Sequence, residues 1–348
     1  MFGEWLLQIK SIYESLGDEV SKEIFKNRLL YSLSGDSKYI KNIITTTKEG
    51  CEIYNILEDR KRKKVIFGAG IWAHEILNAY KDIEFECMVD NRIVERTVDD
   101  TGMPIVSFDE YMKEYRDAIV VIATRLYHKE IYEQLLENGI VEENIINAGK
   151  MLDSMSVRQY FDLPELKLSN NEVFIDAGSF DGKTASCFVD LCRKRGIKYK
   201  GIWAFEPDSN NRGKCINTLE SCGSKKYQVI ECGLWHEDTE LRFSSGGNAF
   251  SKVLNDGDSI VKVRALDNII KDDDVTFIKM DIEGAEYNAL LGAEQIIKKN
   301  KPKLAISIYH KPEDICEIPL LIKKMNEEYK FYLRHYSVAE FDTVLYAI

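Results

Sequence analysis

The first 60 residues carry apolar side chains at three- and four-residue spacing, which is the pattern of amphipathic helices. The pair Gly17-Asp18 separates two such stripes, of which the first includes Ile9 and Ile12. Neither stripe carries an unusual polar group on its apolar face, so packing explains it better than ligand binding. We therefore predict a helical N-terminal segment over residues 1–60.

From residue 61 onward, short apolar runs alternate with helical stripes, which is typical of parallel α/β folds. Val65-Ile66-Phe67 leads into the turn Gly68-Ala69-Gly70, and a second apolar run ends at Asp90. A helical crossover between two strands makes the strands parallel. We predict a small Rossmann-like domain over residues 61–150 and a connector over residues 151–170.

A second α/β series occupies residues 171–348. Apolar runs near residues 173–175, 202–205, 227–230 and 277–280 predict strands, and most of them lead into acidic residues. The carboxyl ends of such strands form the crevice where open α/β sheets bind their ligands. We expect the chemistry of this chain at that crevice.

The first turn of this second series combines two glycines with two acids. Gly178 and Gly182 let the backbone approach a ligand closely, whereas Asp176 and Asp181 would repel a pyrophosphate. S-adenosylmethionine carries an ammonium group, a sulfonium and a ribose diol but no phosphate. The turn therefore favours S-adenosylmethionine over a dinucleotide.

Two further positions fit the same cofactor. Glu206 lies at the tip of the next predicted strand, 24 residues after Gly182, where a carboxylate can accept hydrogen bonds from ribose hydroxyls. The third strand leads to Gly233, where adenine would lie in a doubly wound sheet.

The predicted strand at residues 277–280 carries charged residues at its carboxyl end. Lys279 and Asp281 interrupt apolar neighbours and must be paired if they are buried. Glu283 and Glu286 can each favour the start of the following helix through its dipole, and for Glu286 we prefer that interpretation. Four motifs result, in this order: Phe174-Ile175-Asp176-Ala177-Gly178, Phe205-Glu206-Pro207, Leu266-Asp267 and Ile278-Lys279-Met280-Asp281-Ile282-Glu283-Gly284-Ala285-Glu286.

This set resembles the FkbM family of S-adenosylmethionine-dependent methyltransferases over residues 172–348. The resemblance implies a class I methyltransferase fold, with a seven-stranded sheet whose last strand is antiparallel. It also implies methyl transfer to a hydroxyl acceptor, commonly on a sugar or a polyketide. Phe180 departs from the pattern, because many methyltransferases have glycine at that position of the turn.

Our first hypothesis for function is O-methylation of a sugar, glycan or related hydroxyl. Such a reaction needs the acceptor aligned with the methyl group and its proton removed. Asp281 is the leading candidate for the base and His310, after a predicted strand at 304–309, is the second; Lys279 would orient Asp281 or the substrate. Carboxylates at 281 and 283 leave a divalent metal ion open, but we predict none.

The turn at Gly68 supports a second hypothesis. Gly68, Gly70 and Asp90 have the spacing of a nucleotide-binding turn with a ribose-binding acid. A nucleotide- or NAD-dependent sugar-modifying oxidoreductase or epimerase centred there is the alternative to the methyltransferase. A third hypothesis is a non-catalytic binding module that retains the cofactor fold.

Composition and charge limit the binding partners and the cellular compartment that we expect for this chain. The 348 residues include 47 basic and 58 acidic side chains, a net charge of −11 that disfavours nucleic acid. No apolar run has the length of a membrane span, and no secretory signal is recognised at the N-terminus. The eight cysteines are scattered as expected for free thiols, which predicts a cytoplasmic protein. A homo-oligomer is left open.

Overall fold

The computed structural model describes residues 2–243, 259–271 and 274–348. The chain forms two compact units. The larger unit comprises Met1–Phe25, Gln159–Arg334 and Asp342–Ile348, and the smaller unit comprises Lys26–Arg158 and His335–Phe341. Each unit therefore contains segments that are distant in sequence.

The N-terminal segment is helical, as predicted. It forms α1 (Phe2–Ser15), α2 (Glu19–Ser34), α3 (Ser37–Ile44) and α4 (Lys48–Leu57). Polar residues cap α2, α3 and α4, because the first backbone N–H groups of a helix lack partners inside it. Asp18 accepts from the N–H of Ser21 at the start of α2. Asp36 accepts from the N–H of Lys38, and Thr47 accepts from that of Gly50.

The smaller unit has a six-stranded sheet in the order β3-β4-β2-β1-β5-β6. The strands β4, β2, β1, β5 and β6 are parallel, and β3 is antiparallel to β4. The bounds are β1 (Lys64–Phe67), α5 (Ile71–Ala79), β2 (Cys87–Val89), β3 (Thr97–Val98), β4 (Pro104–Val106), α6 (Phe108–Glu114), β5 (Ile119–Ile122), α7 (His128–Glu137), β6 (Ile145–Ile146) and α8 (Ala148–Arg158), with a short 3-10 helix at Glu142–Asn144.

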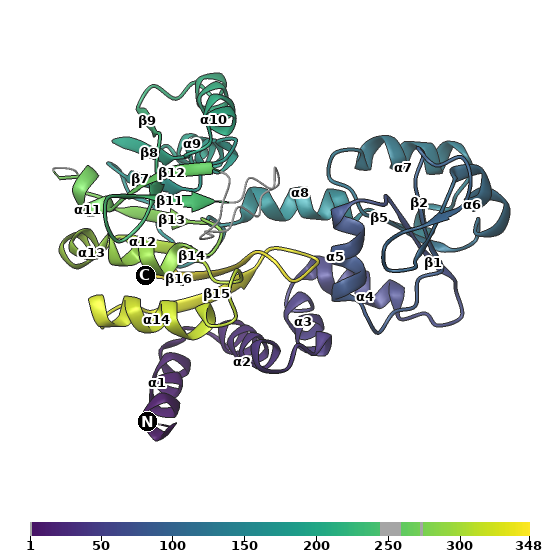
Figure 1. Ribbon diagram of the computed structural model, residues 1–348, viewed down its shortest axis with the longest axis horizontal. Helices are drawn as coiled ribbons and strands as arrows, with labels where there is room; N and C mark the ends of the chain where they lie inside the picture. The colour runs from purple at the N-terminus through teal and green to yellow at the C-terminus, as the bar shows by residue number, and fades with distance from the viewer. Residues whose placement is uncertain (1, 244–258, 272–273) are drawn as a thin grey trace. The chain divides into compact units, whose positions relative to one another are not determined.

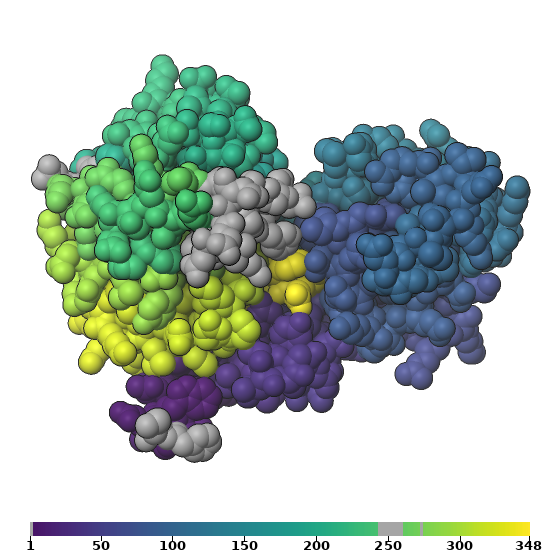
Figure 2. Space-filling model, viewed as in Figure 1, coloured from purple at the N-terminus to yellow at the C-terminus, as the bar shows by residue number. Residues whose placement is uncertain are grey.

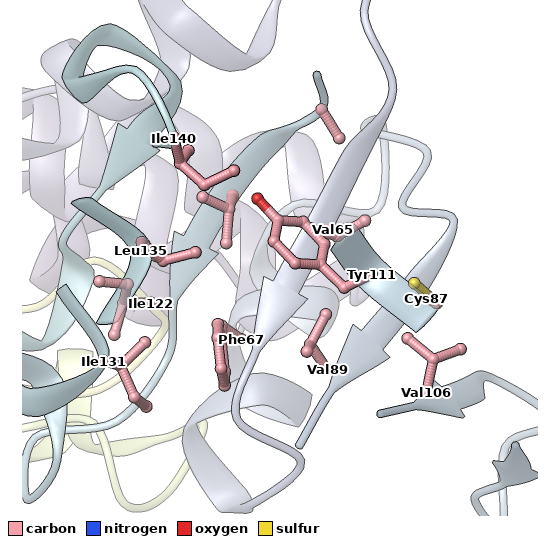
Figure 3. Close-up of a cluster of buried hydrophobic side chains, with 12 residues drawn as sticks. Val65, Phe67, Cys87, Val89, Val106, Tyr111, Ile122, Ile131, Leu135 and Ile140 are labelled. Atoms are coloured by element: carbon pink, nitrogen blue, oxygen red, sulfur yellow. The ribbon is translucent and has the colours of Figure 1, made fainter. Parts of the chain in front are cut away.

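The core of the smaller unit is apolar. Val65 and Phe67 of β1 point into the same cluster as Val89 of β2 and Ile122 of β5, and Leu135 of α7 covers them (Figure 3). All of these side chains are almost fully buried. Their alternation along β1 and β2 follows from the period of a strand, which turns every second side chain to one face.

The larger unit has a seven-stranded sheet in the order β15-β16-β14-β13-β7-β8-β9, labelled in Figure 1. Strand β16 is antiparallel to β14, and β14, β13, β7, β8 and β9 are parallel. The α/β fold class and its antiparallel last strand are thus confirmed. The strands are β7 (Val173–Ala177), β8 (Gly201–Phe205), β9 (Tyr227–Ile230), β13 (Phe277–Met280), β14 (Lys303–Ser307), β15 (Phe331–His335) and β16 (Thr343–Ala347).

Helices and a small second sheet complete the larger unit. A three-stranded sheet has the order β10-β12-β11, with β10 (Gly233–Leu234), β11 (Thr239–Phe243) and β12 (Ser259–Arg264). Within the described ranges, no helix combines the length and apolar character needed to cross a membrane. The helices are α9 (Lys183–Arg195), α10 (Ser209–Ser221), α11 (Leu266–Ile269), α12 (Glu286–Leu291), α13 (Glu294–Asn300) and α14 (Asp314–Met325).

The first 25 residues pack on the last strands of the larger unit. The N–H of Gly17 donates to the carbonyl of Phe331, and Asp18 forms an ion pair with Arg334 at 2.6 Å. Lys323 of α14 donates to the hydroxyl of Ser11 in α1. Figure 2 shows the purple N-terminal residues against the yellow C-terminal ones.

Candidate active site

The site residues predicted for the larger unit converge on one edge of its sheet. Strands β8, β7, β13 and β14 are parallel neighbours, so their carboxyl ends lie together. Asp281 follows β13 directly, and His310 lies three residues beyond β14. The residues that we expect at the crevice therefore lie close together at the carboxyl ends of these strands.

The turn after β7 depends on glycine. Gly178 has φ +73°, and a Cβ on it would lie 1.9 Å from the carbonyl oxygen of Asp281. Gly182 has φ +78° and begins α9 without a side-chain cap. Phe180, which stands where many methyltransferases have glycine, has φ +47°. The turn thus keeps a glycine-like conformation at a phenylalanine, a strained state that costs about 1–3 kcal/mol.

Glu206 holds this turn in place. Its two carboxylate oxygens accept hydrogen bonds from the N–H groups of Phe180 and Asp208, each at 2.9 Å. Burial raises the pKa of Glu206. An ionised carboxylate has about four acceptor sites, so two backbone bonds leave Glu206 able to accept from a ligand.

Asp176 and Lys279 form a buried ion pair beneath the turn. They are register partners on β7 and β13, and Lys279 Nζ lies 2.9 Å from Asp176 Oδ1. The ammonium group also donates to the carbonyls of Ala177 and Gly178. Burial raises the pKa of Asp176, although Lys279 opposes the shift. Lys279 therefore pairs with Asp176 and the turn, whereas the role predicted for it from the sequence is to orient Asp281 or the substrate.

Asp281 is held by two tyrosine hydroxyls. Tyr160 donates to its Oδ2 at 2.8 Å, and Tyr309 donates to its Oδ1 at 3.2 Å. Burial by itself would raise the pKa of Asp281, but the charges of Lys279 and His310 and the hydrogen bonds of Tyr160 and Ser307 lower it. Its side chain keeps 24% of its surface exposed, so the carboxylate is both fixed and reachable.

His310 lies between three carboxylates. Its Nδ1 is 3.1 Å from Glu286, and its Nε2 is 3.5 Å from both Asp281 and Glu283. Burial lowers the pKa of His310, but these three acids together raise it to about 9. Burial raises the pKa of Glu283 to about 7, where Asp281 and Glu286 add to the shift.

Unusual backbone conformations gather around this site. Six described residues other than glycine have positive φ, and three of them, Tyr160, Phe180 and Glu283, contact the residues named above. A fourth, Asp342, accepts a hydrogen bond from Gln159. Strained conformations persist where the surrounding structure enforces them, and they cluster at functional sites.

The remaining predicted cofactor residues lie at the same turn or on the small sheet. Asp181 accepts from the backbone of Lys183 and pairs with its ammonium group at 2.6 Å. Gly233 lies in β10, where a Cβ would stand 3.2 Å from Val263. Arg212 pairs with Glu231 near the end of β9.

Sequence reasoning missed three residues of the site. Tyr160 and Tyr309 contact Asp281, and Glu286 contacts His310 although we had assigned it to the dipole of the following helix. Glu286 also accepts from the N–H of Ile282 at 2.7 Å. The signal available for Glu286 was its position within the motif around Asp281. Tyr160 lies in the connector, where no sequence pattern indicates a site residue.

The predicted site of the smaller unit has a different character. Asp90 accepts from the N–H of Arg92 and forms a bidentate pair with its guanidinium at 2.7–2.9 Å. These contacts, with Arg92 the largest cause, lower the pKa of Asp90. Gly68 has φ +112°, and Gly70 begins α5 without a side-chain cap.

The sheet of the larger unit, with its antiparallel last strand and its acid-rich glycine turn, has the class I methyltransferase fold. Residues 176–336 match the methyltransferase FkbM domain. The family and the methyltransferase class predicted from the sequence are thus confirmed, together with S-adenosylmethionine as the cofactor of that class. Residues 60–146 match a domain described as C2185-like, N-terminal.

Solved structures resemble the chain to different extents. Methyltransferase FkbM from Methylobacillus flagellatus KT is 22% identical, with 87% of this chain and 94% of that chain covered and a TM-score of 0.53. An rRNA methylase from Streptococcus thermophilus is 16% identical over 57% and 90% of the two chains, with a TM-score of 0.34. A putative methyltransferase from Streptococcus mutans in complex with SAH is 14% identical over 58% and 98%, with a TM-score of 0.33. No curated protein matches the chain.

Proposed function

We propose that this methyltransferase transfers a methyl group to a hydroxyl of a sugar, a glycan or a related small molecule. The observation that carries the proposal is the contact between the glycine turn and the end of β13. Gly178 lies against the backbone of Asp281, so a cofactor held by the turn is next to a fixed carboxylate. A hydroxyl that binds Asp281 is then beside the methyl donor.

The residues around the turn fit S-adenosylmethionine chemically. Glu206 retains acceptor capacity for ribose hydroxyls, and the acids of the turn suit a ligand with an ammonium and a sulfonium group. When bound, S-adenosylmethionine supplies a methyl group on positively charged sulfur. Asp176 supports the site indirectly, because it holds Lys279 against the carbonyl of Gly178.

Asp281 is proposed to accept a hydrogen bond from the acceptor hydroxyl. Tyr160 and Tyr309 fix the carboxylate, which favours alignment of the two substrates. The charges of Lys279 and His310 and the hydrogen bond of Tyr160 lower the pKa of Asp281 and so weaken it as a base. Its first role is therefore to orient the acceptor hydroxyl. Variants of Asp281 and His310 must then show which of the two removes the proton.

The test is transfer of labelled methyl from S-adenosylmethionine to matched pairs of glycosides with and without a free hydroxyl. We expect a methyl ether on the hydroxyl compounds alone, located by mass spectrometry. Asp281→Asn should lower single-turnover transfer by about 100- to 10,000-fold, while cofactor affinity changes little. Asp90→Asn in the smaller unit is the matched control. Transfer to nitrogen, or equal transfer to the deoxy compounds, would refute the proposal.

His310→Ala separates the two candidate bases. If His310→Ala abolishes transfer while Asp281→Asn retains it, His310 removes the proton. If both variants remain active, alignment alone drives the reaction and neither side chain acts as the base.

A further inference from the structure

Next to Asp281, the larger unit buries several carboxylates around one imidazole. Glu286 is fully buried, and Asp314 on α14 is 3% exposed. Lys279 on β13 is engaged by Asp176 and two carbonyls. Buried acids are costly unless a cation or hydrogen bonds compensate them.

Two side chains in this cluster have polar atoms without a hydrogen-bond partner among the described residues. Glu286 Oε1 accepts from the N–H of Ile282, whereas its Oε2 has no partner. Both ring nitrogens of His310, whose side chain is 92% buried, also lack hydrogen-bond geometry despite their closeness to acids. A buried polar atom left without a partner costs about 1–3 kcal/mol. These atoms therefore point to a ligand.

We propose that Asp281, Glu286 and His310 bind a divalent metal ion. Each offers one donor atom, and the three atoms lie within 4.8 Å of one another. Metal bonds to such donors are about 2.0–2.2 Å long, so donors of one ion lie at most about 4.4 Å apart. Shifts of a few tenths of an ångström would bring the three donor atoms within bonding distance of one ion.

The surroundings of the donors are those of a metal centre. The hydroxyls of Tyr160 and Tyr309 orient Asp281, and the N–H of Ile282 orients Glu286. Hydrogen bonds of this kind fix metal ligands and raise affinity. One imidazole with two carboxylates suits Mn²⁺ or Zn²⁺. From the sequence we predict no metal ion, and the carboxylate pair left open there consists of Asp281 and Glu283, without Glu286.

The solvent side of the cluster gives the ion a function in the proposed O-methylation, on which this part of the inference rests. Asp281 is 24% exposed and Glu283 is 32% exposed, whereas Glu286 is fully buried. Protein ligands thus occupy the inner side, and the acceptor hydroxyl can take an outer position. A bound divalent ion lowers the pKa of a coordinated hydroxyl, so the oxygen becomes a better nucleophile.

The test measures Mn²⁺ binding to the full chain by calorimetry and electron paramagnetic resonance, without S-adenosylmethionine or acceptor. We expect one Mn²⁺ per chain and about 100-fold weaker binding in Glu286→Gln and in His310→Ala. Asp181→Asn removes a carboxylate at the turn outside the donor set and should leave Mn²⁺ affinity unchanged. Circular dichroism checks that each variant is folded, and His310→Ala replaces Glu286→Gln if the latter is not.

The outcomes distinguish this inference from the proposed function. Absence of Mn²⁺ binding in the wild type, or equal binding in all variants, overturns the metal site even if hydroxyls are methylated. Mn²⁺ binding that the two ligand variants weaken supports the site even if no hydroxyl acceptor is methylated. If chelation abolishes methyl transfer and Mn²⁺ restores it, the result supports a role of the metal ion in the proposed O-methylation.

Discussion

The two units place an acid at the same point of a similar fold and use it differently. In each unit a glycine turn joins the first parallel strand to a helix, and an acid follows the neighbouring strand. In the smaller unit Arg92 neutralises Asp90, and the core beneath is apolar. In the larger unit Glu206 accepts hydrogen bonds from two backbone N–H groups, and the buried pair of Asp176 and Lys279 lies beneath.

This difference teaches that a glycine turn alone does not define a site. Buried ionic groups are expensive, so an apolar core beneath a turn is the cheaper solution when the turn needs only to fold. The larger unit retains a buried lysine, strained residues and an acid with free acceptor capacity. These features, rather than the turn, distinguish the methyltransferase site from the turn at Gly68.

The largest expected contrast is between the two ion pairs. Lys279→Met should lower the free energy of unfolding of the larger unit by about 3–5 kcal/mol, because Asp176 is then buried without a cation. Arg92→Met should lower the free energy of unfolding of the smaller unit far less, because the Arg92 side chain is 81% exposed and solvent screens its charge. Urea unfolding followed by hydrogen exchange resolves the two units. Equal losses would remove the contrast.

The glycines give the next contrast. Gly178→Ala should cost the larger unit about 2–4 kcal/mol, because a Cβ meets the carbonyl of Asp281 and φ is positive. Gly70→Ala should cost less than about 1 kcal/mol, because nothing lies within 4 Å of its Cβ and φ is −108°. The same unfolding experiment measures both. A neutral Gly178→Ala would mean that the turn is less tightly packed than described.

The acids after the second strands should differ in cofactor binding. Glu206→Ala should weaken S-adenosylmethionine binding by about 1.5–3 kcal/mol, the range for a hydrogen bond to a charged group. Asp90→Ala should leave that affinity unchanged. Titration calorimetry on the three proteins decides the matter, and equal affinity in wild type and Glu206→Ala would contradict the assignment.

The turn at Gly68 should not support hydride transfer, because Asp90 is engaged by Arg92. We expect no nicotinamide oxidation or reduction with candidate nucleotide sugars, followed by absorbance over time. The Arg92→Met variant removes the partner of Asp90, so it is the more stringent test for nicotinamide turnover at this turn. Turnover of the nicotinamide by the wild type would restore the alternative function.

A buried histidine gives the smallest effect, on the pH dependence of the smaller unit. Burial lowers the pKa of His335 to about 3, and the charge of Arg28 adds to the shift. Between pH 6.5 and 3 the unfolded chain therefore binds the extra proton, and stability falls as pH falls. His335→Gln should remove up to about 1.4 kcal/mol per pH unit from this slope. Unfolding at pH 7.5 and 5.5 measures it, and an unchanged slope would show that His335 does not titrate as described.

The sequence predicted the features that local patterns encode. Strand β7 is an apolar run, and the motif around Asp281 carries a lysine, three acids and a glycine at fixed spacing. Glu206 was recognisable because it follows a strand and a glycine turn. These signals depend on neighbours in sequence, so they predicted the fold class and placed candidate residues on one sheet edge.

The rest depends on contacts between distant residues. Tyr160 contacts Asp281, which lies 121 positions later in the sequence. The hydrophobic pattern around Tyr160 does not indicate that its hydroxyl belongs to the site. The contact of His310 with Glu286 requires the register of β13 and β14, which no local signal gives. Gly233 was predicted from strand order alone, and that reasoning did not anticipate the separate small sheet.

The interleaved path of the chain constrains how the larger unit is made. Asp18 and Arg334 are 316 positions apart, and Gly17 must meet Phe331. During synthesis at about 5–20 residues per second, α1 therefore waits tens of seconds for its partners. Its apolar face has no packing partner during that interval. Closure of the methyltransferase unit is consequently a late event, completed when β15 and β16 have left the ribosome.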